Sequence, residues 1–362
     1  MSAGGGAGIR RLVFWQPIVS PHQRDFLEIL QARYSGEVIL AAERPLPAER
    51  LAQGWPPVVH ERVPVVDVSG AAGFERLVAH DRADTLHLFS GFFSHPTVWR
   101  AFRRLVPSAA RLGIVSEAPQ LGPITGPLKI LRGRLLVRRY GDRFALVLPM
   151  GAVGRRFFAA VGFAPARLAT FGYHVAVPDL GATPDPAPGP VRIVAAGQLI
   201  RRKGFDILLD ALATLPAGGW ECDLFGDGPL RRGLETRAAR QGTPRVRGTV
   251  PHAALVAELA RADLAVVPSR HDGWGMLVNE SLGAGTPVVC TDACGAADLI
   301  DDPAAGAVVP AGDVAALAAA LRHAVAGGKI DGARRARVHA VARRHGPEGA
   351  VERFLALVAA LR

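Results

Sequence analysis

Apolar positions along this chain follow two alternating patterns. Short runs of consecutive apolar residues end in loops, and the segments that follow them repeat apolar residues every three or four positions, as at Phe26, Leu30 and Tyr34. A run of the first kind predicts a buried strand, and a segment of the second kind predicts a helix. In the first half of the chain, strands are predicted within residues 10–19, 37–44, 111–119 and 144–151, and helices within residues 20–34 and 97–106. Residues 75–93 are predicted to form a helix followed by a strand around residues 86–89.

The alternation stops within residues 175–192, where Pro, Gly and Ala accumulate, and this composition predicts a linker. Strands alternating with helices form parallel sheets. We therefore expect an α/β protein of two Rossmann-like domains, residues 1–174 and 191–345, joined by a linker at 175–190, with ligands bound in a cleft between them. In the second half, strands are predicted within residues 191–197, 220–228, 245–250, 264–270 and 287–293. Helices are predicted within residues 205–215, 230–241, 252–262, 276–285 and 347–362.

Composition narrows the class of protein. The chain has 362 residues, of which 49% are hydrophobic and 21% charged, a balance typical of globular proteins. No segment is long and apolar enough to span a bilayer, and the Gly-rich N-terminus does not resemble a signal peptide, so we expect a cytoplasmic location. The three cysteines, Cys222, Cys290 and Cys294, fit buried thiols in a reducing compartment and predict no zinc site.

The net charge of +11 is concentrated in the first half. Residues 1–170 carry 22 basic and 12 acidic side chains, whereas residues 171–362 carry 21 and 20. The densest basic region, residues 129–143, interleaves its cations with Leu128, Ile130, Leu131, Leu135 and Leu136. This pattern fits an anionic membrane leaflet, a phosphate-bearing substrate or nucleic acid, and it also fits a solvated Arg-rich helix.

The most informative stretch is SRHDGWGMLVNESLGAGTPVVCTDACG, residues 269–295. It places Asp272 in the loop after a predicted strand and Glu280 about one turn inside the following helix. Glycines at 273 and 275 let backbone N–H groups approach a ligand, and a helix N-terminus favours phosphate or sugar oxygens. A carboxylate accepts two hydroxyl hydrogen bonds, so two acids suit the two diols of a nucleotide sugar. A capping acid and a solvated Glu would give the same pattern.

A second strand of the same domain ends in a basic turn, GQLIRRKG, residues 197–204. Its cations, Arg201, Arg202 and Lys203, precede a helix N-terminus and therefore suit a diphosphate. A third strand ends in the turn GDGP, residues 226–229, whose backbone we expect to lie alongside the base of a bound nucleotide.

These turns, with ADLAVVPS, DGWG and ESLGAGTPVV in the same order and spacing, make residues 191–300 resemble the donor domain of the retaining GT-B glycosyltransferases of family 4, within glycosyl transferases group 1. The resemblance implies a GT-B fold with parallel sheets facing across a cleft, an acceptor-binding N-terminal domain, and a last helix, residues 346–362, that crosses back to that domain. It also implies donor contacts from Arg202, Lys203, Gly226, Asp272, Gly273, Trp274, Gly275, Met276, Leu277 and Glu280.

The roles implied by the resemblance are specific. Lys203 with an adjacent Arg would hold the diphosphate, Glu280 the ribose hydroxyls, and Asp272 the transferred sugar. Two positions depart from the family: Asp272 replaces the usual Glu, and Gln198 replaces the usual Arg. The missing charge is expected at Arg201 or Arg202, and we favour Arg202.

The first domain offers its own candidates at strand ends. Glu117, where many family members have His, is a candidate catalytic carboxylate beside Ser116, although capping or core roles fit it equally. We expect His22, Ser90, Gly91 and Ser116 to bind the acceptor. His87 and His95 lie near the same strand ends and are more typical of structural histidines.

The expected activity is therefore retaining transfer of a hexose-type sugar from a UDP- or GDP-sugar to a hydroxyl of a glycan or lipid-linked saccharide during surface polysaccharide assembly. Lys203, Asp272 and Glu117 are the expected catalytic residues. No Asp-x-Asp triplet occurs, so we expect no metal and no cofactor. The expected partners are the donor, the acceptor and the anionic inner leaflet, without nucleic acid.

Other functions fit parts of the sequence. A small-molecule acceptor and a non-catalytic nucleotide-sugar-binding paralogue are the nearest alternatives. A dinucleotide-dependent enzyme would need G-x-G-x-x-G after the first strand, which WQPIVSPHQ lacks. A nucleic-acid-binding protein would use the basic half, but only 6% of residues are aromatic and no RNA-binding motif occurs.

Overall fold

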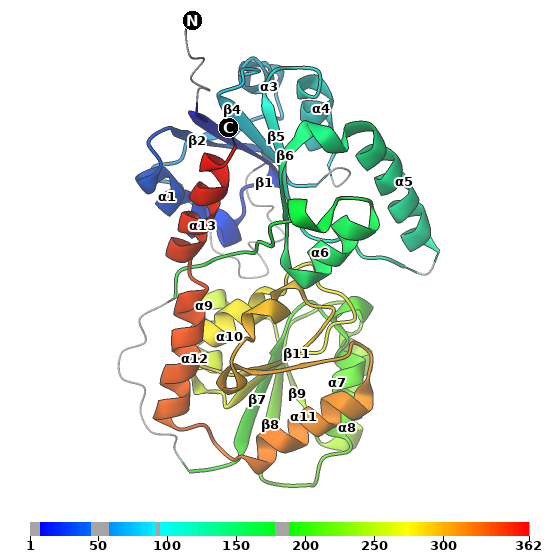
Figure 1. Ribbon diagram of the computed structural model, residues 1–362. Coiled ribbons are helices and arrows are strands. Elements are labelled where there is room, and N and C mark those ends of the chain that lie inside the picture. The colour runs from blue at the N-terminus through cyan, green and yellow to red at the C-terminus, as the bar shows by residue number, and fades with distance from the viewer. Residues whose placement is uncertain (1–7, 45–57, 92–94, 123, 178–187, 362) are drawn as a thin grey trace, which may run out of the picture. The chain divides into compact units, whose positions relative to one another are not determined.

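The computed structural model describes residues 8–44, 58–91, 95–122, 124–177 and 188–361 (Figure 1). Most of the predicted linker, residues 178–187, lies outside the described residues. The chain divides into two compact units. Among the described residues, unit 1 comprises 8–44, 58–175 and 347–361, and unit 2 comprises 176–346.

Unit 1 contains a six-stranded parallel sheet in the order β3-β2-β1-β4-β5-β6. The strands are β1 (Arg11–Ile18), β2 (Glu37–Arg44), β3 (Val65–Asp67), β4 (Thr85–Phe89), β5 (Arg111–Ser116) and β6 (Phe144–Pro149). The helices are α1 (Pro21–Arg33), α3 (Ala71–Val78), α4 (Pro96–Leu105), α5 (Thr125–Tyr140), α6 (Gly151–Ala160) and α13 (Pro347–Ala359), with 3₁₀ turns η1 (Gly141–Arg143) and η2 (Pro165–Arg167).

Both faces of β1 are buried, as expected for a central parallel strand. Val13 and Trp15 face a core layer shared with α3 and α4, whereas Phe14 faces the opposite layer. There the ring of Phe14 lies 6.4 Å from Phe26 of α1 and 6.0 Å from Phe354 of α13. Residues 347–359 therefore complete the core of unit 1, and Figure 1 shows α13 beside α1.

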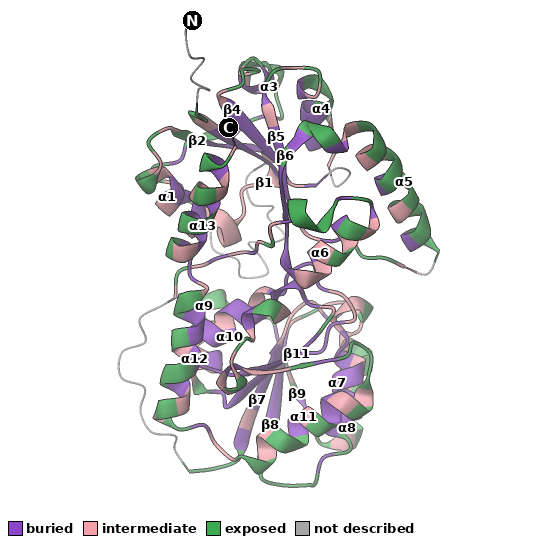
Figure 2. Ribbon diagram, in the orientation of Figure 1, coloured by how far each residue is buried: buried purple, intermediate pink, exposed green. Residues whose placement is uncertain are grey.

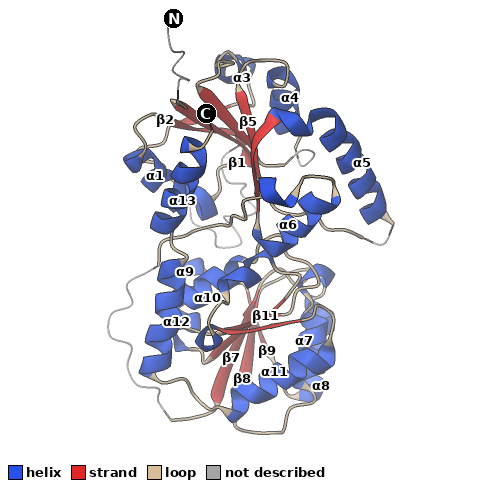
Figure 3. Ribbon diagram, viewed as in Figure 1, coloured by secondary structure: helices blue, strands red, loops and turns tan. Residues whose placement is uncertain are grey.

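Unit 2 repeats this topology in the order β12-β11-β10-β7-β8-β9, again all parallel. Figure 3 shows the strands of each unit gathered into one sheet with helices around it. The strands are β7 (Val191–Ala196), β8 (Trp220–Phe225), β9 (Arg245–Gly248), β10 (Leu264–Val267), β11 (Val288–Thr291) and β12 (Gly306–Val309). The helices are α7 (Phe205–Leu212), α8 (Arg231–Gln241), α9 (His252–Arg261), α10 (Met276–Gly283), α11 (Val314–Ala326) and α12 (Gly332–Arg344), with η3 (Arg201–Lys203), η4 (Gly295–Leu299) and η5 (Pro303–Ala305).

The predicted α/β class with two Rossmann-like units is confirmed. Each sheet has the doubly wound order in which the chain reverses direction beside its first strand. No element was predicted from the sequence at β3, β12, α6, α11 or α12. The two strands are only three and four residues long. Helix α11 does repeat apolar residues at helical spacing, and Leu317 and Leu321 of that repeat are buried against the unit.

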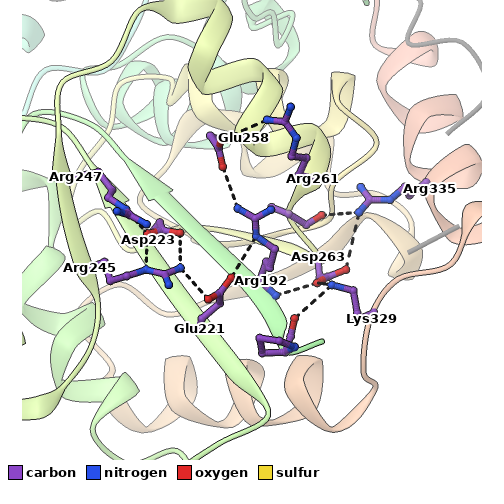
Figure 4. Close-up of polar contacts among 12 residues, drawn as sticks. Arg192, Glu221, Asp223, Arg245, Arg247, Glu258, Arg261, Asp263, Lys329 and Arg335 are labelled. Carbon is purple, nitrogen blue, oxygen red and sulfur yellow. Dashed lines mark hydrogen bonds and ion pairs between the residues drawn. The ribbon is translucent and has the colours of Figure 1, made fainter. Parts of the chain in front are cut away.

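At the edge of unit 2 where the strands begin, a buried acid binds several neighbouring segments (Figure 4). Asp263, which immediately precedes β10, accepts hydrogen bonds from the backbone N–H groups of Arg192 at 2.8 Å and Ile330 at 3.2 Å. Its carboxylate also lies 3.2 Å from Nζ of Lys329 and 3.9 Å from Nη2 of Arg335. Burial lowers the pKa of Arg335. Asp263, the acid of the ADLAVVPS motif, therefore joins β7, β10 and the segment before α12.

A neighbouring acid supports the same edge. Asp223 of β8 is bound by Arg245 at 2.8 Å and by Arg247 at 2.7 Å, both on β9. Arg245 also reaches Glu221 at 2.9 Å, and Glu221 lies 3.4 Å from Arg192 (Figure 4). Charges thus connect three adjacent strands at their amino ends.

None of the described helices is long and apolar enough to cross a bilayer.

Candidate functional site

The candidate site lies at the carboxyl ends of the strands of unit 2, opposite the acid network. β7 and β10 are neighbours in the sheet, and the chain leaves them toward opposite sides. Ligands of doubly wound sheets bind beside such a reversal. The loop after β7 carries Arg202 and Lys203, and the loop after β10 carries Asp272. The fold therefore brings together two segments that are about 70 residues apart in the sequence.

Lys203 and Arg202 both pair with Asp272. The Nζ atom of Lys203 lies 2.5 Å from Oδ2, and Nη1 of Arg202 lies 3.4 Å from Oδ1. Arg202 also donates to the carbonyl of His271 at 3.0 Å. The carboxylate is only 10% exposed, so the two cations compensate a nearly buried charge. The structure thus places the three residues in one cluster, and Arg202 is the arginine of the turn that contacts Asp272.

Backbone and side-chain contacts hold the two loops together. Arg270 donates to the carbonyl of Arg202 at 2.9 Å through its backbone. Its guanidinium makes two hydrogen bonds, 2.6 and 2.8 Å long, to the carboxylate of Asp206 in the first turn of α7. These bonds lower the pKa of Asp206. A bidentate pair of this kind fixes geometry as well as charge, so it sets the position of Lys203 relative to Asp272.

The loop between Asp272 and α10 is tightly packed. Gly275 has φ of 98°, and a Cβ there would lie 2.4 Å from Sγ of Cys294, so glycine is required. The buried indole of Trp274 donates to Oδ1 of Asn279 at 2.7 Å, which directs this side chain inward. Leu277 is buried as well, so the side chains of Trp274 and Leu277 offer a ligand little surface, and the backbone of this loop is the expected contact. Gly275 gives the first turn of α10 no side-chain cap.

Glu280 lies in α10, and it pairs with a residue that the sequence analysis did not single out. Its Oε1 atom is 3.1 Å from Nε2 of His252, the first residue of α9. The side chain of Glu280 is 16% exposed and that of His252 is 45% exposed. The hydrogen bond to Glu280 is the main reason that the pKa of His252 is raised. One oxygen of the carboxylate is therefore oriented by an imidazole.

This pair predicts a pH-dependent stability difference. Because the pKa of His252 is raised in the folded protein, its stabilising effect is complete below the ordinary histidine pKa of about 6.5 and is lost as the pH rises through the folded value. We expect His252→Gln to lower the melting temperature at about pH 5.5 and to have little effect at about pH 8.5. Thermal unfolding across this range measures the difference, and an equal loss at both pH values would contradict the prediction.

The GDGP turn has a steric explanation. Gly226 has φ of 138°, and a Cβ there would lie 1.9 Å from the carbonyl oxygen of Gly197. The backbone of Leu199 donates to the carbonyl of Asp227 at 2.8 Å and accepts from Leu230 at 2.9 Å. The turns after β7 and β8 therefore pack directly on one another, which requires Gly226 whether or not a base lies beside it.

In unit 1, two predicted residues meet at a tyrosine. The ring of His22, at the start of α1, lies 5.7 Å from the ring of Tyr173. The pKa of Tyr173 is raised well above its ordinary value by burial, and a charge interaction and hydrogen bond with Glu117 add to the shift. Tyr173 therefore stays neutral and donates to the Glu117 carboxylate. Ser116, which ends β5, donates to the carbonyl of Glu117 at 3.0 Å and orients the same loop.

The remaining candidates of unit 1 lie after β4. The backbone of Ser90 donates to the carbonyl of Trp15 at 3.1 Å, and Gly91 has φ of 92°. His87 is fully buried, accepts from the indole of Trp15 at 3.0 Å, and contacts the carbonyl of His80 at 2.9 Å. Burial lowers the pKa of His87 to about 4, so it is a neutral core residue. His95 pairs with Glu43 at 2.7 Å.

His252 and Tyr173 were not among the site residues predicted from the sequence. His252 follows β9 by four positions, so the rule that ligand-binding residues follow strand ends, applied to this strand too, would have included it. Tyr173 follows an isolated bridge between Met150 and Phe171 rather than a strand, and no sequence pattern marks it.

Comparison with solved structures defines the class of fold. The chain superimposes on the Anabaena protein HepE in complex with UDP and glucose with a TM-score of 0.69 and 16% identity, covering 97% of this chain and 99% of HepE. It superimposes on the lipopolysaccharide outer core galactosyltransferase WaaB with a TM-score of 0.71 and 12% identity, covering 96% and 99%. The fold is therefore GT-B, as the sequence predicts.

Comparison of sequences concerns mainly unit 2. Residues 190–326 match the family model of glycosyl transferases group 1. Over 145 residues the chain is 36% identical to the lipopolysaccharide core biosynthesis glycosyltransferase LpsE of Rhizobium meliloti, covering 39% of this chain and 41% of LpsE. It is 32% identical to glycogen synthase of Mycobacterium tuberculosis, covering 38% and 34%. The chain thus spans less than half the length of these curated relatives.

Proposed function

We propose that this protein is a retaining, metal-independent glycosyltransferase of family 4. It would transfer a hexose-type sugar from a UDP- or GDP-sugar to a hydroxyl of a glycan or lipid-linked saccharide in surface polysaccharide assembly. The observation that carries this proposal is the cluster of Lys203, Arg202 and Asp272 beside the strand reversal of unit 2. The match of the same segment to glycosyl transferases group 1 supports it.

The chemistry requires stabilisation of a leaving diphosphate. In the transfer, the bond between the anomeric carbon and the diphosphate oxygen breaks, a bond to the acceptor oxygen forms, and the acceptor hydroxyl loses its proton. Lys203 and Arg202 would neutralise the diphosphate, with help from the uncapped first turn of α10. Asp272 keeps lone pairs beyond those that its two cations occupy, and these would accept sugar hydroxyls.

Unit 1 would supply the acceptor site. Glu117 is our candidate for accepting the acceptor proton or steadying positive charge, and its partner Tyr173 would hold it in place. Ser116, His22, Ser90 and Gly91 are the candidate acceptor contacts. A small-molecule acceptor would use the same groups.

Nucleotide binding by Glu280 tests the proposal. We expect UDP or GDP to bind the full chain, and Glu280→Gln to weaken this binding about 10- to 100-fold, because hydrogen bonds from the ribose hydroxyls to a charged carboxylate are lost. Isothermal titration calorimetry measures both affinities. Glu352→Gln, an exposed acid of α13, serves as the control.

A 2′,3′-dideoxynucleoside diphosphate sharpens the experiment. This analogue lacks the ribose hydroxyls, so the wild type and Glu280→Gln should bind it equally. An equal loss for the analogue and the natural nucleotide would contradict the ribose role. Donor binding without transfer or donor hydrolysis would exclude the enzyme and indicate a nucleotide-sugar-binding protein.

A further inference from the structure

Helix α5 of unit 1 exposes an apolar stripe. Ile124, Leu128, Leu131 and Leu135 are 80%, 63%, 56% and 60% exposed. Their spacing of four, three and four residues places them in one row along the helix. Figure 2 shows exposed residues along α5. Large exposed apolar side chains gathered on one surface mark an interaction site more often than scattered ones do.

The opposite face of α5 contacts unit 1, so the stripe lies on the side of the helix that points away from the core. Gly133 is buried, and a Cβ there would lie 2.5 Å from Cγ1 of Val161. Leu136, Val137 and Tyr140 pack against the core of unit 1. The apolar residues of this region therefore divide between two faces. Ile130 and Leu136, which the sequence analysis grouped with the exposed leucines, are only partly exposed.

Positive charge flanks the stripe. Residues 125–140 contain five basic side chains and no acidic one. At about 100° per residue, Arg132 and Arg139 lie along one side of the stripe and Arg138 along the other, and all three are exposed. An apolar row between rows of cations is the arrangement of helices that lie in the headgroup layer of an anionic membrane.

We infer that α5 docks unit 1 on an anionic lipid surface. Ile124, Leu128, Leu131 and Leu135 enter the boundary between headgroups and acyl chains, and Arg132, Arg138 and Arg139 contact lipid phosphates. Pairing with a second copy through this face is disfavoured because it would bring like charges together without a carboxylate on the helix. This inference does not depend on the proposed transferase activity.

Vesicle sedimentation of the full chain tests the inference. We expect the protein to sediment with vesicles of phosphatidylcholine containing about one third phosphatidylglycerol, and much less with phosphatidylcholine alone. Replacing Arg132, Arg138 and Arg139 together by Gln should lower the partition coefficient about 100-fold. Replacing Leu128, Leu131 and Leu135 together by Ser should lower it at least about 10-fold, because the apolar contact is lost.

A matched variant distinguishes vesicle binding through α5 from binding that depends only on the net positive charge of the protein. Arg76, Arg103 and Arg104 are exposed on α3 and α4 of the same unit, and their replacement by Gln removes the same charge without touching α5. We expect this control to bind vesicles like the wild type. Equal losses in the two arginine triples, or unchanged binding of the serine triple, would overturn the inference.

Two further measurements keep the result interpretable. Thermal unfolding should show that the serine triple is folded, as expected for exposed positions, and nucleotide binding should be unchanged in it. Sedimentation velocity detects self-association. A dimer that the serine triple converts to a monomer would overturn the lipid assignment and assign the stripe to a second copy of the chain.

Discussion

Replacing Lys203 by alanine is expected to lower the turnover of a nucleotide-sugar donor by about 100- to 1,000-fold, the usual loss when one preorganised charge on a leaving group is removed. The ammonium is held 2.5 Å from Asp272, within loops joined by the Arg270–Asp206 pair, so its position is preorganised. Initial rates at saturating donor measure the effect. Lys203→Arg should recover part of the activity because the charge is kept.

The pairing with Asp272 requires a control, since losing Lys203 leaves that buried carboxylate with Arg202 alone. If Lys203 only neutralised Asp272, Lys203→Ala would lower the melting temperature but leave the affinity for UDP or GDP unchanged. If Lys203 acts on the diphosphate, Lys203→Ala also weakens binding of UDP or GDP, whereas binding of the nucleoside alone, which lacks the diphosphate, is unchanged. Lys129→Ala, a change of an exposed lysine of α5, should turn over soluble donor like the wild type. Wild-type rates in Lys203→Ala would refute the assigned role.

The second large effect concerns stability. Asp263→Ala is expected to lower the free energy of unfolding of unit 2 by about 3–5 kcal/mol, because removal of one partner leaves buried charges uncompensated. The change would leave two backbone N–H groups, those of Arg192 and Ile330, without their acceptor. It would also remove the carboxylate nearest to Lys329 and to the buried Arg335.

Differential scanning calorimetry measures this loss, which corresponds to a melting temperature about 6–20 °C lower for a domain of this size. Glu258→Gln is the matched control, because Glu258 binds Arg192 at the same edge but is 29% exposed. Its loss should cost no more than about 1 kcal/mol. A similar shift in both variants would show that the burial of Asp263 has no special importance.

Local patterns predict the sheets better than they predict the site. Runs such as residues 191–197 and 264–270 show where strands end, and the motifs around Lys203 and Asp272 mark loops that the sheet order then makes neighbours. The order itself follows from long-range packing. For the same reason the spacing of the sequence does not reveal that His252 pairs with Glu280, 28 residues away, or that Tyr173 contacts Glu117.

Helix α5 shows the same limit. Its leucines and arginines are visible in the sequence, but which of them face solvent depends on the close contact of Gly133 with Val161. Asp263 is the reverse case. Its motif is evident in the sequence, yet the structure places it at the strand end opposite the candidate site, where it joins elements rather than facing the site.

Unit 1 is discontinuous in the chain, and this affects how it is made. The rings of Phe14 and Phe26 pack against Phe354, which the ribosome adds only after the whole of unit 2. The aromatic face of unit 1 therefore stays open to water and to chaperones until this late segment packs on it. A released chain that ends before residue 347 should have a second unit that resists proteases and a first unit that is digested.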